Sequence, residues 1–389
     1  MRFLPCLKDK GFRATNIMRT LQLLIKPASS LCNLKCSYCF YHDLATHQQS
    51  KPQLMSLEIL DKTLQRAAEY FDNNEEGYLS ILFQGGEPTL AGLKYFEQVI
   101  ALQERYFSSK LNVSISNSIQ TNACKLKGDL VKFLSEHNFF FGISLDGPQD
   151  IHDANRTHLN GQGSYSEVLN GMELLLAHNA QFHVLCVLTD LNALNIDKVY
   201  NHFKKLGLYH QQYIACLDPF DRPENQHFLS EQAYQKFLVD IFDLWYHDLM
   251  EHHTYFSIRH IENYLALLLG MDINSCNMTG VCQVQNVVES NGNIFPCDFY
   301  AHDDYQLGNV TKQSFDSMIK STRALNFVQK SQALSSSCQT CPYLNLCRNG
   351  CMREREQGKN IHCLAFKHFF DQRLSQLKLA AAHLHALNS

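Results

Sequence analysis

Three cysteines lie close together near the start of the sequence, at Cys32, Cys36 and Cys39. The spacing Cys-x3-Cys-x2-Cys places three thiolates within eight residues, and no fourth cysteine lies nearby. Thiolates are soft ligands that select zinc, copper(I) or iron–sulfur clusters. Because a structural zinc site prefers four protein ligands, the triad favours a 4Fe–4S cluster with one reactive iron that has no protein ligand. A zinc knuckle or three buried thiols are the alternatives.

A second group of eight cysteines occupies the C-terminal third of the sequence. Eight thiolates could ligate two 4Fe–4S clusters completely, and a pair of zinc ribbons is the alternative. Inside this group, Asn291-Gly292 predicts the turn of a β-hairpin. The spacing alone does not show which cysteines share a cluster. The group consists of Cys276, Cys282, Cys297, Cys338, Cys341, Cys347, Cys351 and Cys363.

The composition is that of a globular protein with a full hydrophobic core. The 389 residues suffice for one large domain and a smaller one, and 45% of them are hydrophobic. The formal net charge is −4 without a basic block, which argues against nucleic acid as a partner. No apolar run approaches a membrane span, and no secretory signal is present. We therefore expect a soluble, cytoplasmic protein whose fifteen cysteines bind metal or act in catalysis.

Apolar runs of strand length alternate with stretches of helical periodicity over residues 21–217. This alternation indicates βαβ units and a parallel sheet, with a site at the carboxyl ends of the strands. Residues 228–270 continue with a helical pattern. The predicted strands are 21–25, 79–83, 111–120, 139–145, 182–188 and 213–217, and the predicted helices are 56–71, 92–106, 128–137, 164–178 and 195–206.

Polar residues follow several of these strands. Gly85-Gly86-Glu87-Pro88 comes after the second strand, and glycines let a ligand approach the backbone closely, although an ordinary tight turn would read the same way. Ser144 ends the fourth strand and Arg156 follows it, and a hydroxyl and a guanidinium suit a carboxylate and a ribose. His152 lies in the same loop. We expect it to make a loop hydrogen bond and not to bind metal, because no second His-Asp pair occurs.

The segment Cys32-Asn33-Leu34-Lys35-Cys36-Ser37-Tyr38-Cys39 resembles the signature loop of the radical S-adenosylmethionine (SAM) enzymes. The resemblance implies a partial (β/α)6 barrel in an α/β fold. It also implies that the open iron chelates SAM, which is then cleaved by one electron to a 5′-deoxyadenosyl radical. The SAM contacts implied by the resemblance are Tyr38, Gly86, Ser144, Arg156 and Leu217.

The second cysteine group resembles the SPASM extension of peptide-modifying radical SAM enzymes. With the first triad, this resemblance implies three 4Fe–4S clusters, two of them auxiliary. One auxiliary cluster would take Cys276, Cys282, Cys297 and Cys351, and the other Cys338, Cys341, Cys347 and Cys363.

The two resemblances divide the sequence into four parts. We expect an N-terminal extension at 1–19, a radical SAM core domain at 20–245, a C-terminal SPASM domain at 246–370 and a helical tail at 371–389. Met18 is an alternative translation start.

Residues 83–90, 142–148 and 296–300 further resemble the anaerobic sulfatase-maturating enzymes. That resemblance implies radical SAM oxidation of one cysteine or serine of a sulfatase to Cα-formylglycine (3-oxoalanine). The implied partners are a sulfatase polypeptide with the motif Cys/Ser-x-Pro/Ala-x-Arg and an electron donor of the flavodoxin or ferredoxin type. The sequence departs from the family at Ala123, where glycine is common after Gln-Thr-Asn.

Asp298 directly follows Cys297 and matches the catalytic aspartate of that family, which would be the general base for the substrate thiol or hydroxyl. Without the family, Asp298 reads as a turn or cap residue after the hairpin. Gln84 and Tyr41 are candidates for contacting the substrate peptide. The alternative function is a SPASM-type maturase of a ribosomally made peptide, acting by thioether formation or epimerisation. A non-catalytic electron carrier or zinc-binding module would predict no SAM cleavage.

Overall fold

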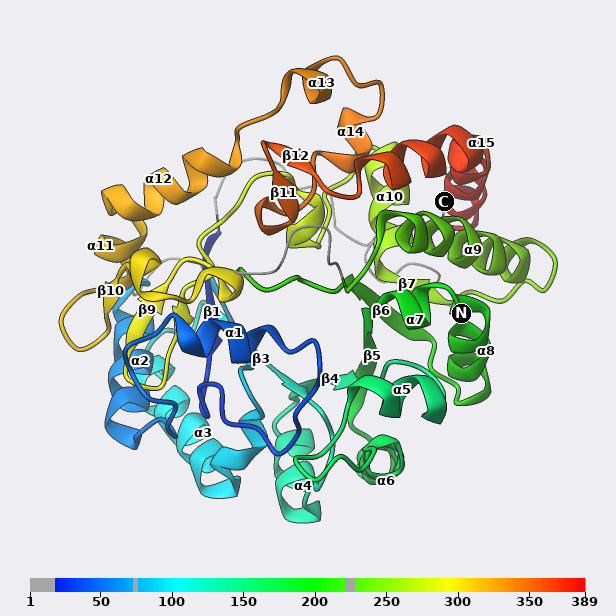
Figure 1. The fold of residues 1–389 in the computed structure, drawn as a ribbon. Coiled ribbons are helices and arrows are strands. Elements are labelled where there is room, and N and C mark those ends of the chain that lie inside the picture. Colours follow the sequence, from blue (N-terminus) through cyan, green and yellow to red (C-terminus); the bar gives the residue numbers. More distant parts are fainter. Residues whose placement is uncertain (1–17, 73–75, 221–227, 389) are drawn as a thin grey trace.

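The computed structural model describes residues 18–72, 76–220 and 228–388 (Figure 1). The predictions for residues 1–17, an extension or an alternative start, lie outside the described residues. The strands are β1 (Arg19–Ile25), β2 (Gly77–Phe83), β3 (Val113–Thr121), β4 (Phe140–Ser144), β5 (Gln181–Leu188), β6 (His210–Ala215), β7 (Ser257–Ile258), β8 (Val287–Val288), β9 (Asn293–Phe295), β10 (Gly308–Asn309), β11 (Arg355–Glu356) and β12 (Lys359–Asn360).

The α-helices connect these strands and extend beyond them. They are α1 (Phe40–Thr46), α2 (Leu57–Glu69), α3 (Leu93–Phe107), α4 (Gly128–Glu136), α5 (Gln149–Asn155), α6 (Tyr165–Ala177), α7 (Asp190–Ala193), α8 (Ile196–Lys205), α9 (Glu231–Met250), α10 (Arg259–Leu268), α11 (Phe315–Ile319), α12 (Thr322–Ser331), α13 (Ser336–Gln339), α14 (Leu344–Cys347) and α15 (Cys363–Asn388).

One ten-stranded sheet runs through the molecule in the order β10-β9-β8-β1-β2-β3-β4-β5-β6-β7. Strands β1 to β7 are parallel, and each lies beside the next along the chain. The sheet curves into an open arc, with α2, α3, α4, α6 and α8 along its outer side (Figure 1). The predicted parallel sheet is therefore confirmed, and in such a barrel the carboxyl ends of the strands share one rim.

Burial explains why the first βα unit forms where it does. Alternate residues of β2 are fully buried, namely Leu79, Ile81 and Phe83, which is the period of a strand. Helix α2 begins after Ser56, whose hydroxyl accepts a hydrogen bond from the Ile59 backbone N–H at 3.3 Å. Ser56 is thus the N-cap of α2, and its hydroxyl satisfies one of the free donors of the first turn.

The predicted hairpin around Asn291-Gly292 is confirmed, and Gly292 has the positive φ of +83° that favours glycine. Its first strand, β8, runs parallel to the end of β1, with Val287 opposite Leu24. The backbone N–H of Lys26 also donates to Val288 O at 2.9 Å. The hairpin therefore extends the barrel sheet and brings the residues that follow it beside the carboxyl end of β1.

Residues 228–270 are largely helical, as their pattern indicates, but they form two helices, α9 and α10, with a short strand between them. Between α9 and α10, β7 pairs in parallel with His210 and Gln211 of β6. Trp245 of α9 supports this turn by donating its indole N–H to Phe256 O at 2.9 Å. A strand of two residues shows no period, so the pattern could not reveal it. The seven-residue helices α1 and α5 were missed for the same reason.

Ala123 explains why glycine is common at its position. It is buried and has a φ of +57°, in the left-handed region. An alanine there costs about 1 kcal/mol relative to glycine, because its Cβ crowds the backbone. The carbonyl oxygen of Ala123 packs on α6, where a Cβ on Gly171 would lie 2.2 Å from it. The departure is therefore a small strain that the fold accommodates.

The C-terminal helix α15 packs against α9. Helix α15 lies along α9 (Figure 1), and Arg373 Nε is 2.6 Å from Asp243 Oδ1 between the two helices. The expected helical tail at 371–389 is the later part of this helix as far as Asn388. Of the helices described, none has both the length and the apolar character needed to cross a bilayer.

Candidate active site

The cysteine loop after β1 is held against the turn 85–88 that follows β2. Gly86 donates its backbone N–H to Ser29 O at 2.7 Å, and Glu87 donates to Leu31 O at 2.8 Å. A Cβ on Gly86 would lie 2.0 Å from Leu31 O, closer than any side chain allows. Glycine is therefore required here to seat the cysteine loop. The implied contact between Gly86 and SAM stays a prediction.

The thiols of the triad are close neighbours in a partly dry environment. Burial, with smaller contributions from Glu87 and the nearby Cys36 and Cys39 thiols, raises the pKa of Cys32 to about 12. Burial also raises the pKa of Cys36 to about 11, against the opposing effect of the Arg156 guanidinium. Bare thiolates are thus disfavoured, and a bound metal is what would deprotonate them. The triad fits the cluster that its spacing indicates.

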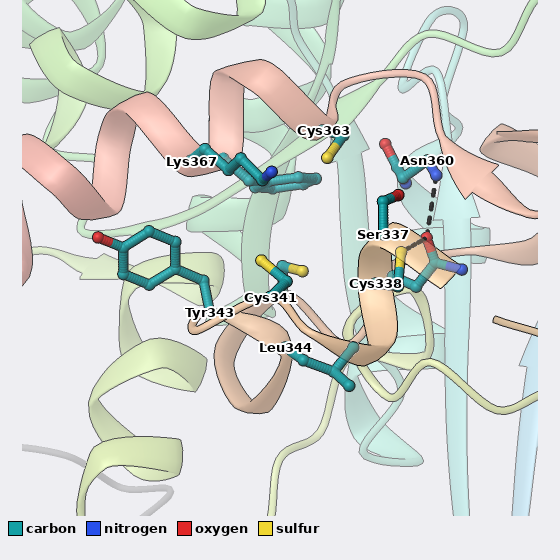
Figure 2. A pocket seen from close by; sticks show the side chains of 11 residues that line it. Ser337, Cys338, Cys341, Tyr343, Leu344, Asn360, Cys363 and Lys367 are labelled. Atoms are coloured by element: carbon teal, nitrogen blue, oxygen red, sulfur yellow. Dashed lines mark hydrogen bonds between the residues drawn. The ribbon is translucent and has the colours of Figure 1, made fainter. Parts of the chain in front are cut away.

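The eight later thiols form two separate sets of neighbours, and within them burial and the nearby thiols raise the pKa of Cys297, Cys351 and Cys347. The first set contains Cys276, Cys282, Cys297 and Cys351. The second set contains Cys338, Cys341, Cys347 and Cys363, which also line a single cavity (Figure 2). These sets coincide with the two that the SPASM resemblance implied, and cluster ligation by them stays a prediction.

The side chains that line the cavity of the second set offer soft ligands to a metal. The lining contains four thiols and no carboxylate, which is the chemistry that selects iron–sulfur clusters. All fourteen cysteines within the described ranges are free of disulfide bonds. Across the same ranges, no three side chains of His, Cys, Asp or Glu meet the geometry of a single-ion site. The residues present fit 4Fe–4S clusters.

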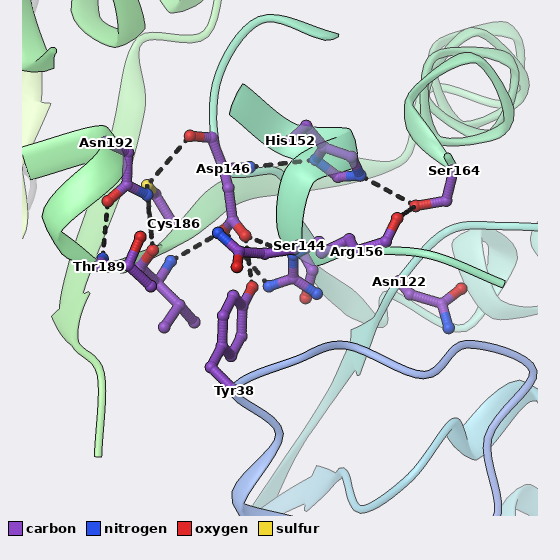
Figure 3. A network of polar contacts seen from close by, with 12 residues as sticks. Tyr38, Asn122, Ser144, Asp146, His152, Arg156, Ser164, Cys186, Thr189 and Asn192 are labelled. Carbon is purple, nitrogen blue, oxygen red and sulfur yellow. Dashed lines mark hydrogen bonds and ion pairs between the residues drawn. The ribbon is translucent and has the colours of Figure 1, made fainter. Parts of the chain in front are cut away.

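Asp146, at the end of β4, is the centre of a buried polar network (Figure 3). It accepts hydrogen bonds from the Tyr38 hydroxyl, from Arg156 Nε at 2.9 Å and from the Val187 backbone N–H at 3.0 Å. Arg156 is buried and also lies beside the Cys36 thiol. Asp146 therefore fixes two predicted SAM-contact residues at the cysteine loop.

His152 makes the loop hydrogen bonds that the sequence led us to expect. Its Nδ1 accepts from the Asp146 backbone N–H at 3.3 Å, and its Nε2 lies 3.1 Å from Ser164 Oγ (Figure 3). Burial lowers the pKa of His152 to about 4, so the imidazole is neutral near pH 7. The ring therefore supports the segment that carries Arg156.

The other implied SAM contacts lie on the same rim of the sheet. Ser144 ends β4, and its Oγ accepts a hydrogen bond from Gln120 Nε2 at 3.1 Å. Leu217 is half-buried two residues after β6. With Tyr38 after β1 and Gly86 after β2, these residues follow the carboxyl ends of parallel strands, where such folds place their sites.

Two distant segments converge on one oxygen of Asp298, which is buried directly after Cys297. The Tyr41 hydroxyl, on α1, donates to Asp298 Oδ2 at 2.5 Å. Gln84 Nε2, directly after β2, donates to the same oxygen at 3.0 Å and to the Tyr41 hydroxyl at 2.9 Å. The structure thus brings together the proposed base and both residues proposed to contact substrate.

Lys26 faces the other oxygen of this carboxylate. Its Nζ lies 3.4 Å from Asp298 Oδ1 and 2.6 Å from Glu289 Oε1, and all three side chains are buried. Burial raises the pKa of Asp298 above its ordinary range, and Lys26 opposes that shift. Burial acts on Glu289 in the same direction, but Lys26 outweighs it and leaves the pKa of Glu289 below its usual value.

Comparison with known proteins assigns both parts of the chain that carry these residues. Residues 27–203 match the radical SAM superfamily, and residues 276–342 match the SPASM iron–sulfur cluster-binding domain. The cysteine-type anaerobic sulfatase-maturating enzyme of Clostridium perfringens (strain 13 / Type A) is 38% identical over 92% of this chain and 98% of its own length. This chain belongs to the anaerobic sulfatase-maturating enzymes.

Other relatives agree with that assignment. The cysteine-type maturating enzyme of Clostridium novyi (strain NT) is 37% identical over 94% of this chain and 99% of its own length. A solved structure of native anSMEcpe with bound AdoMet and Kp18Cys peptide has a TM-score of 0.86 at 37% identity, covering 94% of this chain and 99% of that one. The predicted fold, a radical SAM barrel with a C-terminal SPASM domain, is confirmed.

Two features of this maturating enzyme were not predicted from its sequence. One is the ion pair of Arg156 with Asp146, and the other is the pair of Lys26 with Glu289 and Asp298. A lysine directly after the apolar strand β1 was a signal for the second, because a charge at a buried strand end needs a partner. The sequence did not say which residue that partner would be.

Proposed function

We propose that this maturating enzyme oxidises a cysteine of a sulfatase polypeptide to Cα-formylglycine. The observation that carries the proposal is the convergence of Tyr41, Gln84 and Asp298 beside the thiol set of Cys297. The preference for cysteine rests on similarity, since the cysteine-type relatives named above are 37–38% identical. The serine-type enzyme of Bacteroides thetaiotaomicron is 29% identical over 90% of this chain and 89% of its own length.

Three 4Fe–4S clusters and SAM are the cofactors that the site would hold. The triad would bind the open cluster, and SAM would lie along the strand rim. Once bound, these groups supply hydrogen abstraction from the substrate Cβ and accept the second electron. The SAM contacts we propose are Tyr38, Gly86, Ser144, Arg156 and Leu217.

Asp298 would accept the proton of the substrate thiol at Oδ2. That oxygen is held by Tyr41 and Gln84, which limits its motion and presents it to a peptide lying against them. A general base must reach its proton directly or through one water. Oxidation of the thiol to the thioaldehyde removes a hydrogen atom, a proton and an electron. Hydrolysis then yields the aldehyde and sulfide.

The substrate segment that we propose carries the motif Cys-x-Pro/Ala-x-Arg. A flavodoxin or ferredoxin-type protein would supply the electron that starts each turnover. A maturase of ribosomally made peptides would share the clusters and SAM but would leave no aldehyde, so the reaction product separates the two functions.

The full chain, reconstituted anaerobically with iron and sulfide, tests this proposal. It would receive SAM, dithionite and one of two peptides that differ only in Cys or Ser at the target position. We expect the cysteine peptide to become the aldehyde with stoichiometric deoxyadenosine. Aldehyde from the serine peptide alone would overturn the cysteine preference. Deoxyadenosine without aldehyde would favour the peptide maturase, and no deoxyadenosine at full iron loading would overturn the radical SAM function.

A further inference from the structure

A buried lysine stands behind the proposed base. Lys26 directly follows β1 and is only 2% exposed, so its ammonium has lost almost all contact with water. Such a charge is tolerated in a protein interior only when it is paired. Here one ammonium serves two carboxylates, and its shorter contact is to Glu289, at 2.6 Å, against 3.4 Å to Asp298.

Glu289 and its neighbours fix the position of that ammonium. Gln48 Nε2 donates to Glu289 Oε1 at 3.2 Å and also to Ala301 O. Because the Lys26 backbone N–H donates to Val288 O, both ends of the lysine are tied to the segment that contains β8. On another side, Nζ lies 4.7 Å from the centroid of the Tyr41 ring. The ammonium is thus held by contacts that do not involve Asp298.

The two oxygens of Asp298 have different surroundings. Oδ2 accepts hydrogen bonds from Tyr41 and Gln84. Within the described part of the chain Oδ1 has no partner of good hydrogen-bond geometry, and it faces Lys26. A carboxylate can turn about its Cβ–Cγ bond, so a charge fixed on one side selects one orientation.

We propose that Lys26 is a positioning residue, whose ammonium holds Oδ1 of Asp298 and so presents Oδ2 to Tyr41, Gln84 and the substrate. Glu289 anchors the ammonium and keeps it from closing on Asp298. The inference rests on the proposed role of Asp298 as the proton acceptor. It predicts that loss of Lys26 separates SAM cleavage from aldehyde formation.

The test is the double variant Lys26→Met/Glu289→Gln of the reconstituted enzyme, which removes one positive and one negative charge together. The ratio of formylglycine to deoxyadenosine should fall about 10- to 100-fold, because a loosely held base is misplaced. Binding of the cysteine peptide, measured with SAM but without reductant, should stay within about threefold, since Lys26 does not touch substrate. A merely structural defect would instead lower both products together.

A matched control exists elsewhere in the fold. Lys204 on α8 pairs with the buried Asp248, with its Nζ at 2.7 and 2.6 Å from the two carboxylate oxygens. The variant Lys204→Met also removes a lysine from a buried carboxylate, but away from the site. It should lower the unfolding temperature and leave the product ratio at the wild-type value.

A wild-type product ratio in the double variant would overturn the proposal. If that variant does not fold or bind iron, Glu289→Gln alone decides, because it keeps both Lys26 and Asp298. We expect it to lower the ratio about threefold, and a wild-type ratio there would also overturn the proposal. Asp298→Asn separates the two levels of inference. An unchanged ratio of formylglycine to deoxyadenosine in that variant would reject the proposed base itself. A strongly lowered ratio in Asp298→Asn, together with a wild-type ratio in the Lys26 variant, would reject only the role of Lys26.

Discussion

Two buried aspartates each accept a hydrogen bond from a tyrosine, one in the cysteine loop and the other in α1. The surroundings of the two carboxylates differ. Asp146 accepts from Tyr38, and Asp298 accepts from Tyr41. Asp146 accepts hydrogen bonds from Arg156 Nε at 2.9 Å and Nη2 at 3.4 Å. It also accepts one from the Val187 backbone N–H. Asp298 shares one lysine with Glu289 and leaves Oδ1 without a hydrogen bond of good geometry, as far as the chain is described.

This difference in partners distinguishes a carboxylate that holds the structure in place from one that can react. A carboxylate whose acceptor sites are filled and whose charge is matched one to one is suited to holding other residues in place. A carboxylate that shares its counter-ion and has an incompletely hydrogen-bonded oxygen keeps the capacity to accept a proton. We therefore expect that Asp146 supports the cofactor side of the site and that Asp298 acts on the substrate side.

The largest expected effect is at Asp146. In Asp146→Asn, Arg156 stays buried without its counter-ion, which should cost about 3–5 kcal/mol of folding free energy. Thermal unfolding and an assay of SAM cleavage would show a lower unfolding temperature and loss of deoxyadenosine and formylglycine together. The exposed Asp150 on α5 offers the control Asp150→Asn, expected within about 0.5 kcal/mol of wild type. If Asp146→Asn had normal stability and normal SAM cleavage, the structural role of Asp146 would be rejected.

The second effect is the opposite pattern at Asp298. In Asp298→Asn the formylglycine yield should fall about 10²- to 10⁴-fold, because the variant lacks the proposed general base, while deoxyadenosine should still form. Folding free energy should change by no more than about 1 kcal/mol, since Lys26 keeps Glu289 as its partner. Product analysis by mass and thermal unfolding give both quantities. A strongly destabilised Asp298→Asn would show that the two aspartates are both structural groups.

A milder contrast is expected from the two tyrosines. Tyr38→Phe and Tyr41→Phe each remove one hydrogen bond to a charged group, worth about 1.5–3 kcal/mol. Tyr38→Phe should weaken SAM binding, measured at equilibrium without reductant, and lower both products. Tyr41→Phe should leave SAM binding unchanged and lower formylglycine about tenfold. The same pattern in both variants would contradict the division of the site.

The smallest effect is on the pH dependence of stability. Burial lowers the pKa of His152 to about 4, against about 6.5 in an unfolded chain. Between these values only the unfolded chain binds the proton, so stability is lost as the pH falls from about 6.5 toward 4, by about 1 kcal/mol at pH 6. Urea unfolding from about pH 7 to pH 5.5 should show a shallower loss for His152→Asn than for wild type. The exposed His368 supplies the control His368→Asn, which should keep the wild-type slope.

Local sequence patterns determined most of the elements and the chemistry of this protein. Strands β1 to β6 each lie within a few residues of their predicted places, because apolar residues repeat with the period of a buried strand. The triad at Cys32, Cys36 and Cys39 predicts a cluster with an open iron, because ligand type and spacing are local properties. Gly86, at its close approach to Leu31, is likewise local chemistry that a motif records.

Only the tertiary structure decided which distant residues became neighbours. Lys26 meets Glu289 across 263 positions because β8 adds to the edge of β1, and that pairing leaves no periodic trace in either segment. The two interleaved thiol sets depend in the same way on how the chain returns after Cys297. The hydrophobic period of a segment indicates which of its faces is buried. It does not report which distant residue completes the contact, and only the tertiary structure places Lys26 beside Asp298.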